Sequence, residues 1–512
     1  MPHQKVIAFD TAPAVFARLR QKGKKIVQCH GTFDLLHPGH IYHLEEARAL
    51  GDLLVVTVTA EQYVNKGPGR PFFNDQLRAK SLAALTCVDY VVMVPHAAAV
   101  EAIDCVKPDI YCKGTEYADA GNDVTGNIGD DIAAVKRHGG QVRYIGSVVF
   151  SSTKLINNSF ENLAAPVKNF CRTLAKTCPP DDFRKAVDSL AGLKVLLIGD
   201  IIFDRYANVK MQGLTSKNRI LSVRYLNEET QSGGALAIYR HLKQFCNDVK
   251  FIGLVGREPW VDDVLRAEVK RGEDWIVRDK DFTTIVKQRF NEPLITGKEL
   301  MKLFAVNYMG DAAPSQAAQD AVKKRLVKTL AGFDVVIVAD FGHGLLQLEH
   351  RMMIQEMARF LSLNCQTNSN NHGFNIISKQ YKRADSFSLD EQELLLACAR
   401  RPIEFMKELE KLRKSFGASY AWLTRGAVET IGLHEKEKPS LCLPLEVNVV
   451  DTVGAGDAFF SVVSLAAAKK LPVNLVTFMG QLAGAQAVKI VGNQQPISKA
   501  TLLKSGMSLL NF

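Results

Sequence analysis

Residues 25–40 have the sequence KIVQCHGTFDLLHPGH and predict the fold of the first part of the chain. The apolar run at residues 25–29 is typical of a short buried strand, and residues 41–50 are typical of a helix. A turn that contains Gly31 joins the two. Because strands that alternate with helices in this way build parallel sheets, we expect an α/β domain here.

Two histidines, His37 and His40, stand just before that helix, with Gly39 between them. A helix N-terminus presents unpaired N–H groups and partial positive charge, and therefore attracts phosphate. Imidazoles three positions apart lie on one face of the first turn, and the glycine lets a nucleotide approach closely. The pattern predicts donors that stabilise charge during phosphoryl or nucleotidyl transfer. A metal site or a pair of capping residues is the alternative.

A second strand–loop–helix start lies at residues 194–200, which have the sequence KVLLIGD. It opens another region in which β-rich runs alternate with helical ones, so we expect two α/β domains. The length of 512 residues is too great for one hydrophobic core, which agrees. Residues 161–191 are interpreted as a linker with helical pieces, broken at Pro179 and Pro180. The domains are therefore placed at residues 1–160 and 192–512.

The composition, 47% hydrophobic and 23% charged, is that of a soluble globular protein. The net charge of +10 is spread along the chain without a basic stripe among aromatics, so we expect no nucleic-acid partner. Ten scattered cysteines without a CxxC pair predict reduced thiols and a cytoplasmic protein. No apolar run approaches the ~20 residues that span a bilayer, so no membrane association is expected.

Residues 451–460 (DTVGAGDAFF) carry the strongest pattern of the second domain. Gly454, Ala455 and Gly456 form a turn whose N–H groups converge, and an apolar helix follows at residues 458–468. This arrangement predicts an anion hole at a helix start. Asp457 at its mouth is placed to take a proton from a hydroxyl that attacks a γ-phosphorus. A helix cap formed by Asp457 is the alternative.

Further motifs of the first domain follow in order at residues 51–56 (GDLLVV), 65–67 (NKG), 113–117 (KGTEY) and 151–156 (SSTKLI). With residues 30–40 they closely resemble the cytidylyltransferase-like nucleotidyltransferases, which have a Rossmann-like fold. The likeness is greatest to the transferase half of the bifunctional heptose-phosphate kinase/heptose-1-phosphate adenylyltransferases.

The resemblance implies catalytic roles for three residues of the first domain. His37 and His40 would stabilise the α-phosphate, and Lys66 would bind the triphosphate or the acceptor phosphate. Arg78 would hold the acceptor phosphate, whereas Asp34 would either orient the turn or contact the ligand. The implied nucleotide-binding residues are Gly31, Thr32, Phe33, Lys113, Gly114, Ser151, Ser152 and Thr153.

The second domain carries residues 199–206 (GDIIFDRY), 232–235 (SGGA), 340–344 (DFGHG), 390–393 (DEQE) and 423–426 (LTRG). With residues 451–460 they resemble the ribokinase (PfkB) family of sugar kinases, which implies a ribokinase-like α/β fold. Asp457 would then be the catalytic base. The sugar-binding residues implied are Asp200, Asp204, Gly233 and Gly234. The anion hole and ATP site would comprise Thr424, Gly426, Gly454, Ala455 and Gly456, and Mg²⁺ would bind Asp390 and Glu393.

Both halves depart from these patterns. Residues 145–150 (IGSVVF) lack the Arg-Thr-x-Gly-Ile segment of the glycerol-phosphate enzymes, so both ATP and CTP remain open as nucleotides. In the kinase half, Ala237 replaces an Asn, His343 replaces a Lys, and residues 366–371 (QTNSNN) replace an Asp-Pro-Lys segment. Sugar recognition is therefore expected to differ from that of the family. The domain order is also reversed relative to the heptose enzymes.

We therefore predict a bifunctional enzyme that makes a nucleotide-activated sugar, ADP- or CDP-heptose, from sugar phosphates and nucleoside triphosphates with Mg²⁺. The kinase resemblance also implies that the protein can form a homodimer. One alternative is a nucleotidyltransferase whose kinase-like domain is weak or only binds sugar. Another is a glycerol-phosphate-type cytidylyltransferase.

Overall fold

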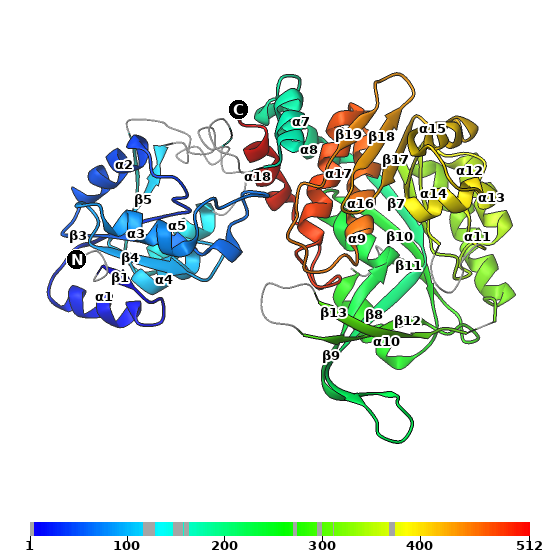
Figure 1. Ribbon diagram of the computed structural model, residues 1–512, viewed down its shortest axis with the longest axis horizontal. Coiled ribbons are helices and arrows are strands. Elements are labelled where there is room, and N and C mark those ends of the chain that lie inside the picture. The colour runs from blue at the N-terminus through cyan, green and yellow to red at the C-terminus, as the bar shows by residue number, and fades with distance from the viewer. Residues whose placement is uncertain are drawn as a thin grey trace. The chain divides into compact units, whose positions relative to one another are not determined.

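The computed structural model describes residues 5–115, 128–146, 157, 163–269, 274–293, 300–310, 312–367 and 374–512 (Figure 1). The chain divides into two compact units. Unit 1 comprises Met1–Pro180 together with Leu503–Phe512, and unit 2 comprises Asp181–Leu502. The last ten residues, which the sequence analysis assigned to the second domain, thus group with the first. Within the described residues, no helix is both long and apolar enough to cross a bilayer.

Unit 1 is built on a parallel six-stranded sheet with the order β1-β4-β3-β2-β5-β6. The strands are β1 (Val6–Ile7), β2 (Ile26–Gly31), β3 (Leu53–Thr59), β4 (Tyr90–Val94), β5 (Ile110–Gly114) and β6 (Gln141–Ile145). The order reverses between β2 and β5, which pair directly. In open parallel sheets, ligands bind at such a switch point, beyond the carboxyl ends of the strands. The ends of β2 and β5 therefore mark the expected crevice.

Helices cover both faces of this sheet. Leu44 of α2 (Pro38–Arg48) and Leu82 of α3 (Asp75–Ala83) pack with Val56 on one face. Phe16 of α1 (Ala12–Gln21) packs with Val55 on the other. Among its described residues, unit 1 also contains α4 (Val100–Val106), α5 (Ile128–Arg137), α7 (Ala165–Ala175) and the end of α18 (Lys499–Leu509). Burial on both faces explains why β3 and β4 are largely apolar.

Unit 2 contains a nine-stranded sheet with the order β11-β10-β7-β14-β15-β16-β17-β18-β19. Its strands are β7 (Lys194–Gly199), β10 (Asp248–Val255), β11 (Asp274–Arg278), β14 (Val335–Asp340), β15 (Leu361–Cys365), β16 (Ser386–Asp390), β17 (Tyr420–Thr424), β18 (Thr430–His434) and β19 (Ser440–Cys442). The pairings β17–β18 and β18–β19 are antiparallel, and the other pairings of this sheet are parallel. The predicted α/β class is confirmed in both units.

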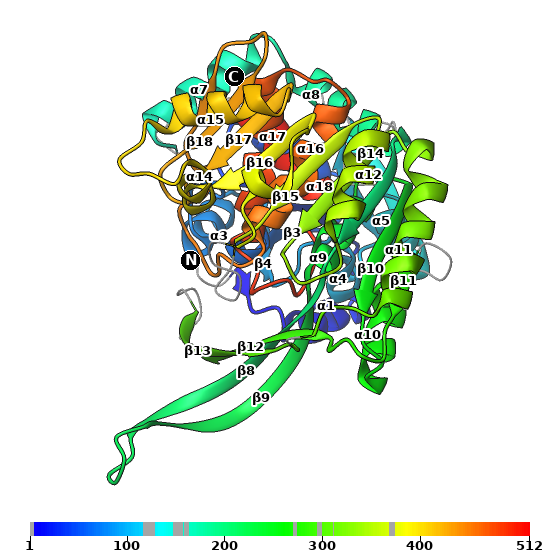
Figure 2. The same ribbon diagram turned by 90° about the vertical axis from the view of Figure 1, so that its right-hand side faces the viewer.

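Helices flank this sheet on two sides, as Figures 1 and 2 show. One side carries α9 (Ala235–Lys243), α16 (Ala455–Ala468) and α17 (Val473–Ala487). The other carries α11 (Gln316–Thr329), α12 (Leu348–Met357), α14 (Glu391–Cys398) and α15 (Phe405–Ser415). Unit 2 also contains the helices α8 (Pro180–Asp188), α10 (Pro259–Glu268) and α13 (Ile377–Gln380). Helix α16 is buried along most of its length, as its apolar sequence requires.

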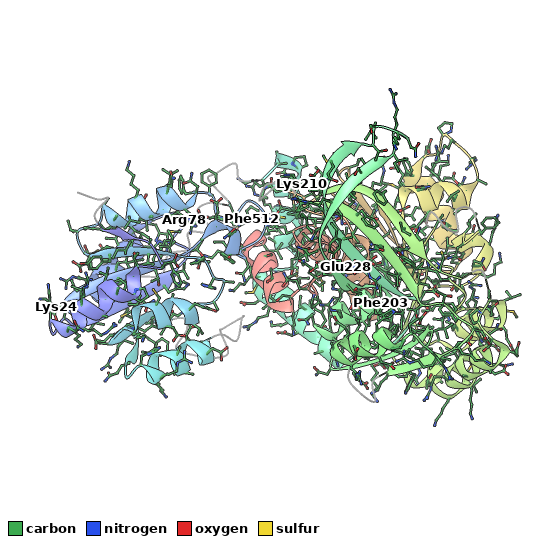
Figure 3. The ribbon with its side chains drawn as sticks, turned by 90° about the horizontal axis from the view of Figure 1, so that it is seen from below. Lys24, Arg78, Phe203, Lys210, Glu228 and Phe512 are labelled. Atoms are coloured by element: carbon green, nitrogen blue, oxygen red, sulfur yellow. The ribbon has the colours of Figure 1, made fainter. Side chains whose placement is uncertain are left out.

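A second, four-stranded sheet of unit 2 has the order β13-β12-β8-β9. It consists of β8 (Ile201–Leu214), β9 (Leu221–Gly234), β12 (Ile285–Glu292) and β13 (Met301–Tyr308). The β8–β9 hairpin projects from the body in Figure 2, and Figure 3 labels Phe203 near its base and Lys210 farther out. Phe203 is buried and Lys210 exposed. The base of the hairpin, not its tip, therefore belongs to the core and to the site described below.

Candidate functional sites

The first candidate site lies where β2 passes into α2. His37 is the N-cap of α2, and its Nδ1 accepts a hydrogen bond of 3.4 Å from the backbone N–H of His40. The two imidazole rings stack with centroids 3.9 Å apart. Pro38 occupies the first helical turn, where its missing N–H is not needed. The two histidines predicted from the sequence are therefore brought together at a helix start.

Both of these histidines favour the neutral form. Burial lowers the pKa of His37, and burial lowers the pKa of His40 to about 3, with the charges of His37 and Lys66 adding to the effect. A neutral imidazole still donates one N–H to a phosphate oxygen. The pair is thus suited to hydrogen bonding with a phosphate and not to acid catalysis at neutral pH.

Asp34 holds the loop that carries Lys66. Its Oδ1 accepts hydrogen bonds from the backbone N–H groups of Phe72 at 2.7 Å and Phe73 at 3.0 Å, and its Oδ2 pairs with Arg70 at 3.4 Å. The side chains of Asp34 and Arg70 are each only 3% exposed. Of the two roles considered for Asp34, this placement supports the orienting one. Lys66 is half-buried, and burial followed by the charge of Arg70 lowers its pKa to about 8.

Arg78 lies beneath the predicted nucleotide-binding turn. Its Nη1 donates to the carbonyl oxygens of Thr32 at 2.7 Å and Thr59 at 2.9 Å, and its Nη2 pairs with Asp75 at 2.5 Å. The side chain is 0% exposed. This placement gives Arg78 a positioning role for the turn, in which Phe33 adopts a φ of 45°. Contact of Arg78 with the acceptor phosphate stays a prediction.

The end of β5 brings Lys113 and Gly114 beside the end of β2. Lys113 Nζ lies 3.0 Å from Asp131 of α5, and His30 of β2 contacts Thr57 and Thr59 at 3.0 and 3.2 Å. Burial and the charge of Lys113 lower the pKa of His30 to about 3. Sequence reasoning missed the roles of His30, Arg70 and Asp131, although His30 directly precedes the GTFD motif. Ser151, Ser152 and Thr153 lie outside the described residues.

The second candidate site, in unit 2, is a cavity of about 220 Å³ at the start of α16. Gly454 adopts a left-handed φ of 82°, and a Cβ there would lie 2.2 Å from Asn493 Oδ1, so only glycine fits. Ala455 and Gly456 continue the turn into the helix. The cavity is lined by Ile202, Asp204, Gly234, Lys287, Arg289, Phe341, Gln366, Val453, Gly454, Gly456, Asp457 and Asn493.

Asp457 stands in the first turn of α16 and faces this cavity. Gln366 Nε2 donates to its Oδ1 at 3.1 Å. Burial, followed by the charge of Asp204, raises the pKa of Asp457 to about 7, whereas the hydrogen bond from Gln366 and the charge of Lys287 oppose the shift. A carboxylate whose pKa lies near the working pH suits general-base chemistry.

Two cations of β12 reach the same cavity. Arg289 forms an ion pair with Asp204, whose Oδ2 also accepts a 3.4 Å hydrogen bond from Asn493. Lys287 lies two positions earlier on the same strand face, and burial lowers its pKa. A Cβ at Gly233 would lie 2.4 Å from Asp204 Oδ2, which explains the glycine. Neither cation was predicted from the sequence. Their spacing of two positions along a strand, which places both on one face, was the feature that could have indicated them.

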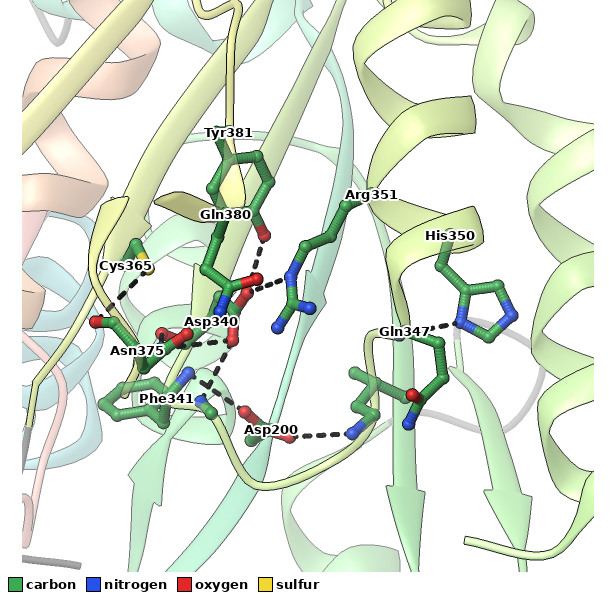
Figure 4. A network of polar contacts seen from close by, with 12 residues as sticks. Asp200, Asp340, Phe341, Gln347, His350, Arg351, Cys365, Asn375, Gln380 and Tyr381 are labelled. Atoms are coloured by element: carbon green, nitrogen blue, oxygen red, sulfur yellow. Dashed lines mark hydrogen bonds and ion pairs between the residues drawn. The ribbon is translucent and has the colours of Figure 1, made fainter. Parts of the chain in front are cut away.

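Asp200 accepts hydrogen bonds from three backbone N–H groups, those of Phe341 at 2.9 Å and of His343 and Leu345 at 3.3 Å. Figure 4 shows its carboxylate below that of Asp340, which binds Arg351 at 2.9 Å and Tyr381 at 2.7 Å. Burial and the charge of Asp340 raise the pKa of Asp200 to about 7. Asp200 thus fixes the turn after β14, and its contact with a sugar stays a prediction.

Asp390 and Glu393, the predicted Mg²⁺ ligands, form a reciprocal capping box at the start of α14. Glu393 N donates to Asp390 Oδ1 at 2.7 Å, Asp390 N donates to Glu393 Oε2 at 2.8 Å, and Thr367 N donates to Glu393 Oε1 at 3.2 Å. Each oxygen of Glu393 therefore accepts one hydrogen bond and keeps a further lone pair, so ligation of Mg²⁺ by Asp390 and Glu393 stays a prediction. The described residues contain no group of three His, Cys, Asp or Glu that could hold a metal ion.

The predicted ATP-site residues Thr424 and Gly426 lie at the end of the adjacent strand. Thr424 is the last residue of β17, and Gly426 has a φ of 52°.

Comparison with known proteins assigns a family model to each unit. Residues 29–158 match the cytidylyltransferase-like model, and residues 193–500 match the model of the pfkB family of carbohydrate kinases. Among curated relatives, the bifunctional protein HldE of Syntrophotalea carbinolica is 42% identical over 136 residues, 26% of each chain. The bifunctional protein HldE of Citrifermentans bemidjiense is 38% identical over 154 residues, 30% of each chain. The chain thus spans less than a third of the length of these two relatives.

One solved structure, phosphofructokinase-2 from Escherichia coli in complex with substrates and products, is 14% identical. The match covers 61% of this chain and 98% of that one, with a TM-score of 0.48.

Proposed function

The chain belongs to the pfkB family of carbohydrate kinases, and on that premise we propose that it is a bifunctional enzyme with two separate transfer sites. Unit 2 phosphorylates a sugar phosphate with ATP. Unit 1 transfers a nucleotidyl group from ATP or CTP to a sugar 1-phosphate. The stacked pair His37 and His40 at the start of α2 is the observation that carries the proposal for unit 1. The cavity that contains Asp457 carries the proposal for unit 2.

In the kinase reaction, Asp457 takes the proton from a sugar hydroxyl as its oxygen attacks the γ-phosphorus of ATP. The bond from this phosphorus to the β,γ-bridging oxygen breaks, and ADP leaves. Backbone N–H groups of the turn at residues 454–456 would stabilise the charge that develops on the transferred group. The presence of Lys287 and Arg289 in the cavity supports the proposal that the sugar substrate already carries an anionic group. The substrate class proposed is therefore a sugar phosphate.

In the transferase reaction, a phosphate oxygen of the sugar 1-phosphate attacks the α-phosphorus of the nucleotide, and pyrophosphate leaves. His37 and His40 donate hydrogen bonds to the α-phosphate as neutral imidazoles, while Lys66 binds the anionic acceptor or triphosphate. No proton has to move between the reacting groups. Mg²⁺ would enter this site, like that of the kinase, bound to the triphosphate.

A heptose is the proposed sugar, and ADP- or CDP-heptose the proposed product, because the motifs of the first unit resemble those of the heptose enzymes. A kinase that starts from a sugar 7-phosphate yields a bisphosphate. A separate phosphatase would then remove the 7-phosphate before nucleotidyl transfer.

The test is to incubate the full chain with Mg-ATP or Mg-CTP and heptose 7-phosphate or 1-phosphate, and to follow the products by mass spectrometry. We expect a heptose bisphosphate with ADP from one reaction and a nucleotide sugar with pyrophosphate from the other. Absence of both transfers from every sugar phosphate tried would refute the proposal. If only nucleotidyl transfer occurs and unit 2 still binds the sugar, the kinase-like unit is a binding module.

A further inference from the structure

The last ten residues of the chain pack on the loop that carries Lys66. This segment, Leu503–Phe512, belongs to unit 1 although it follows the whole kinase sequence. At Gly67, which has a φ of 94°, an added Cβ would lie 3.1 Å from Ser505 Cβ and 3.2 Å from its Cα. The loop and α18 are therefore in close contact immediately beside Lys66.

Asn157 ties the same loop to the end of α18. Arg70 Nη2 donates to Asn157 Oδ1 at 2.9 Å, and Asn157 Nδ2 donates to the carbonyl oxygens of Ser508 at 2.6 Å and Asn511 at 3.0 Å. Asn157 is 3% exposed, and these three bonds are partly buried. The last turn of the chain thereby fixes Arg70, which in turn pairs with Asp34. Two independent contacts thus connect the C-terminal segment to the transferase site.

Lys504 places a further positive charge at this site. Its Nζ donates to Asn65 Oδ1 at 3.3 Å, one position from Lys66. The charge of Lys504 contributes to lowering the pKa of both Lys66 and His30, although burial is the largest cause for each. Lys504 and Lys66 therefore repel each other where they stand. Binding of a polyanion between them would relieve that repulsion.

We propose that Lys504 is a phosphate-binding residue of the transferase site and that it contacts the triphosphate of the incoming nucleotide. This inference rests on the proposed nucleotidyl transfer and deepens it. A triphosphate carries about four negative charges, and cations from several segments stabilise it better than Lys66 alone. The segment Leu503–Phe512 thus acts as a part of the transferase although it follows the kinase sequence.

The experiment compares Lys504→Ala with Lys499→Ala in the full chain. Lys499 lies on the same helix, but its Nζ pairs with Asp188 of unit 2 at 2.7 Å, which makes it a matched control. For Lys504→Ala we expect the KM for the nucleotide in nucleotidyl transfer to rise at least 10-fold. The KM for the sugar 1-phosphate should change less than 3-fold, and kinase activity should equal that of the parent. Lys504→Arg should restore most of the nucleotide affinity.

An unchanged KM for the nucleotide in Lys504→Ala overturns the inference, and so does an equal rise in Lys499→Ala. Kinase activity in the same molecules shows whether unit 2 is folded, and hydrogen exchange of β2 and β5 reports on unit 1. If Lys504→Ala unfolds unit 1, Lys504→Arg and Lys504→Gln measure the charge with the side-chain volume retained. If both folded variants bind the nucleotide as tightly as the parent does, the inference is also contradicted.

Calorimetric titration with inorganic triphosphate separates this inference from the proposed function. The kinase site is identical in both alanine variants, so a difference between them reports on unit 1. Weaker binding to Lys504→Ala than to Lys499→Ala, in a parent that transfers no nucleotidyl group, would support the phosphate site and refute the transferase. Transfer by the parent with equal triphosphate binding in both variants would refute the phosphate site alone.

Discussion

The imidazole rings of His37 and His40 stack with their centroids 3.9 Å apart and their planes inclined by 21°. Two imidazolium ions at this distance would repel each other strongly, whereas two neutral rings do not. The arrangement therefore selects the neutral forms. Hydrogen-bond donation, and not net positive charge, is what this pair offers to a phosphate.

Loss of either ring should weaken nucleotidyl transfer and spare the kinase. We expect His37→Ala and His40→Ala each to reduce kcat for transfer by at least ~100-fold, the effect of removing a charge-stabilising donor. His138→Ala is the control, because this half-buried histidine of unit 1 follows α5 and bonds to Asp104 of α4 at 2.7 Å. Coupled assays of pyrophosphate and ADP release measure the two activities. Equal losses in both would contradict two independent sites.

The neutral state of His40 is itself measurable. Because its pKa falls from 6.5 to about 3 in the folded chain, the unfolded chain binds more protons between these values. The free energy of unfolding of unit 1 should therefore decrease as the pH falls below about 6.5. Histidine-labelled NMR, assigned with His40→Gln, should show no titration of His40 between pH 8 and 5. A midpoint near 6.5 would contradict the burial that causes the shift.

Kinase activity should be lost on the acidic side of neutrality. Asp457 acts as a base only when ionised, and its pKa is raised to about 7, so kcat/KM should fall as the pH drops through 7. In Gln366→Ala the hydrogen bond that opposes this shift is removed, and the acidic limb should move to higher pH. Asp457→Asn should abolish the kinase and leave nucleotidyl transfer intact. A pH profile of Gln366→Ala identical to that of the parent would contradict this account of Asp457.

The sequence predicts those parts of the fold and sites that are local. The helix starts at His37 and Gly454 were found because glycines and a predicted helix lie within a few residues of the functional groups. Lys287 was missed, because a strand in a separate sheet carries no motif. The contact of Asn157 with Ser508 joins residues 351 positions apart, and only tertiary structure reveals such a pair.

Asp200 is a residue that the sequence identified but whose hydrogen-bond partners it could not predict. The resemblance to the ribokinase family implies sugar binding for Asp200, and the structure adds that three N–H groups of a turn about 140 residues later donate to its carboxylate. Arg78 is a similar case in unit 1, since its guanidinium meets backbone carbonyl groups that no sequence pattern identifies. A charged side chain in a motif indicates importance, but its partner is decided by packing.

The two roles considered for Arg78 make opposite predictions for Arg78→Met. A buried carbonyl oxygen left without its donor costs about 1–3 kcal/mol, and the carbonyls of Thr32 and Thr59 would both lose one. A positioning role therefore predicts that the free energy of unfolding of unit 1 falls by about 2–6 kcal/mol, measured by hydrogen exchange of β2 and β3. Arg48→Met is the control, because Arg48 pairs with Asp89 at 3.0 Å in a partly exposed site and should change stability by less than about 1 kcal/mol. A rise in the KM for the sugar 1-phosphate with stability unchanged would instead assign Arg78 to the acceptor.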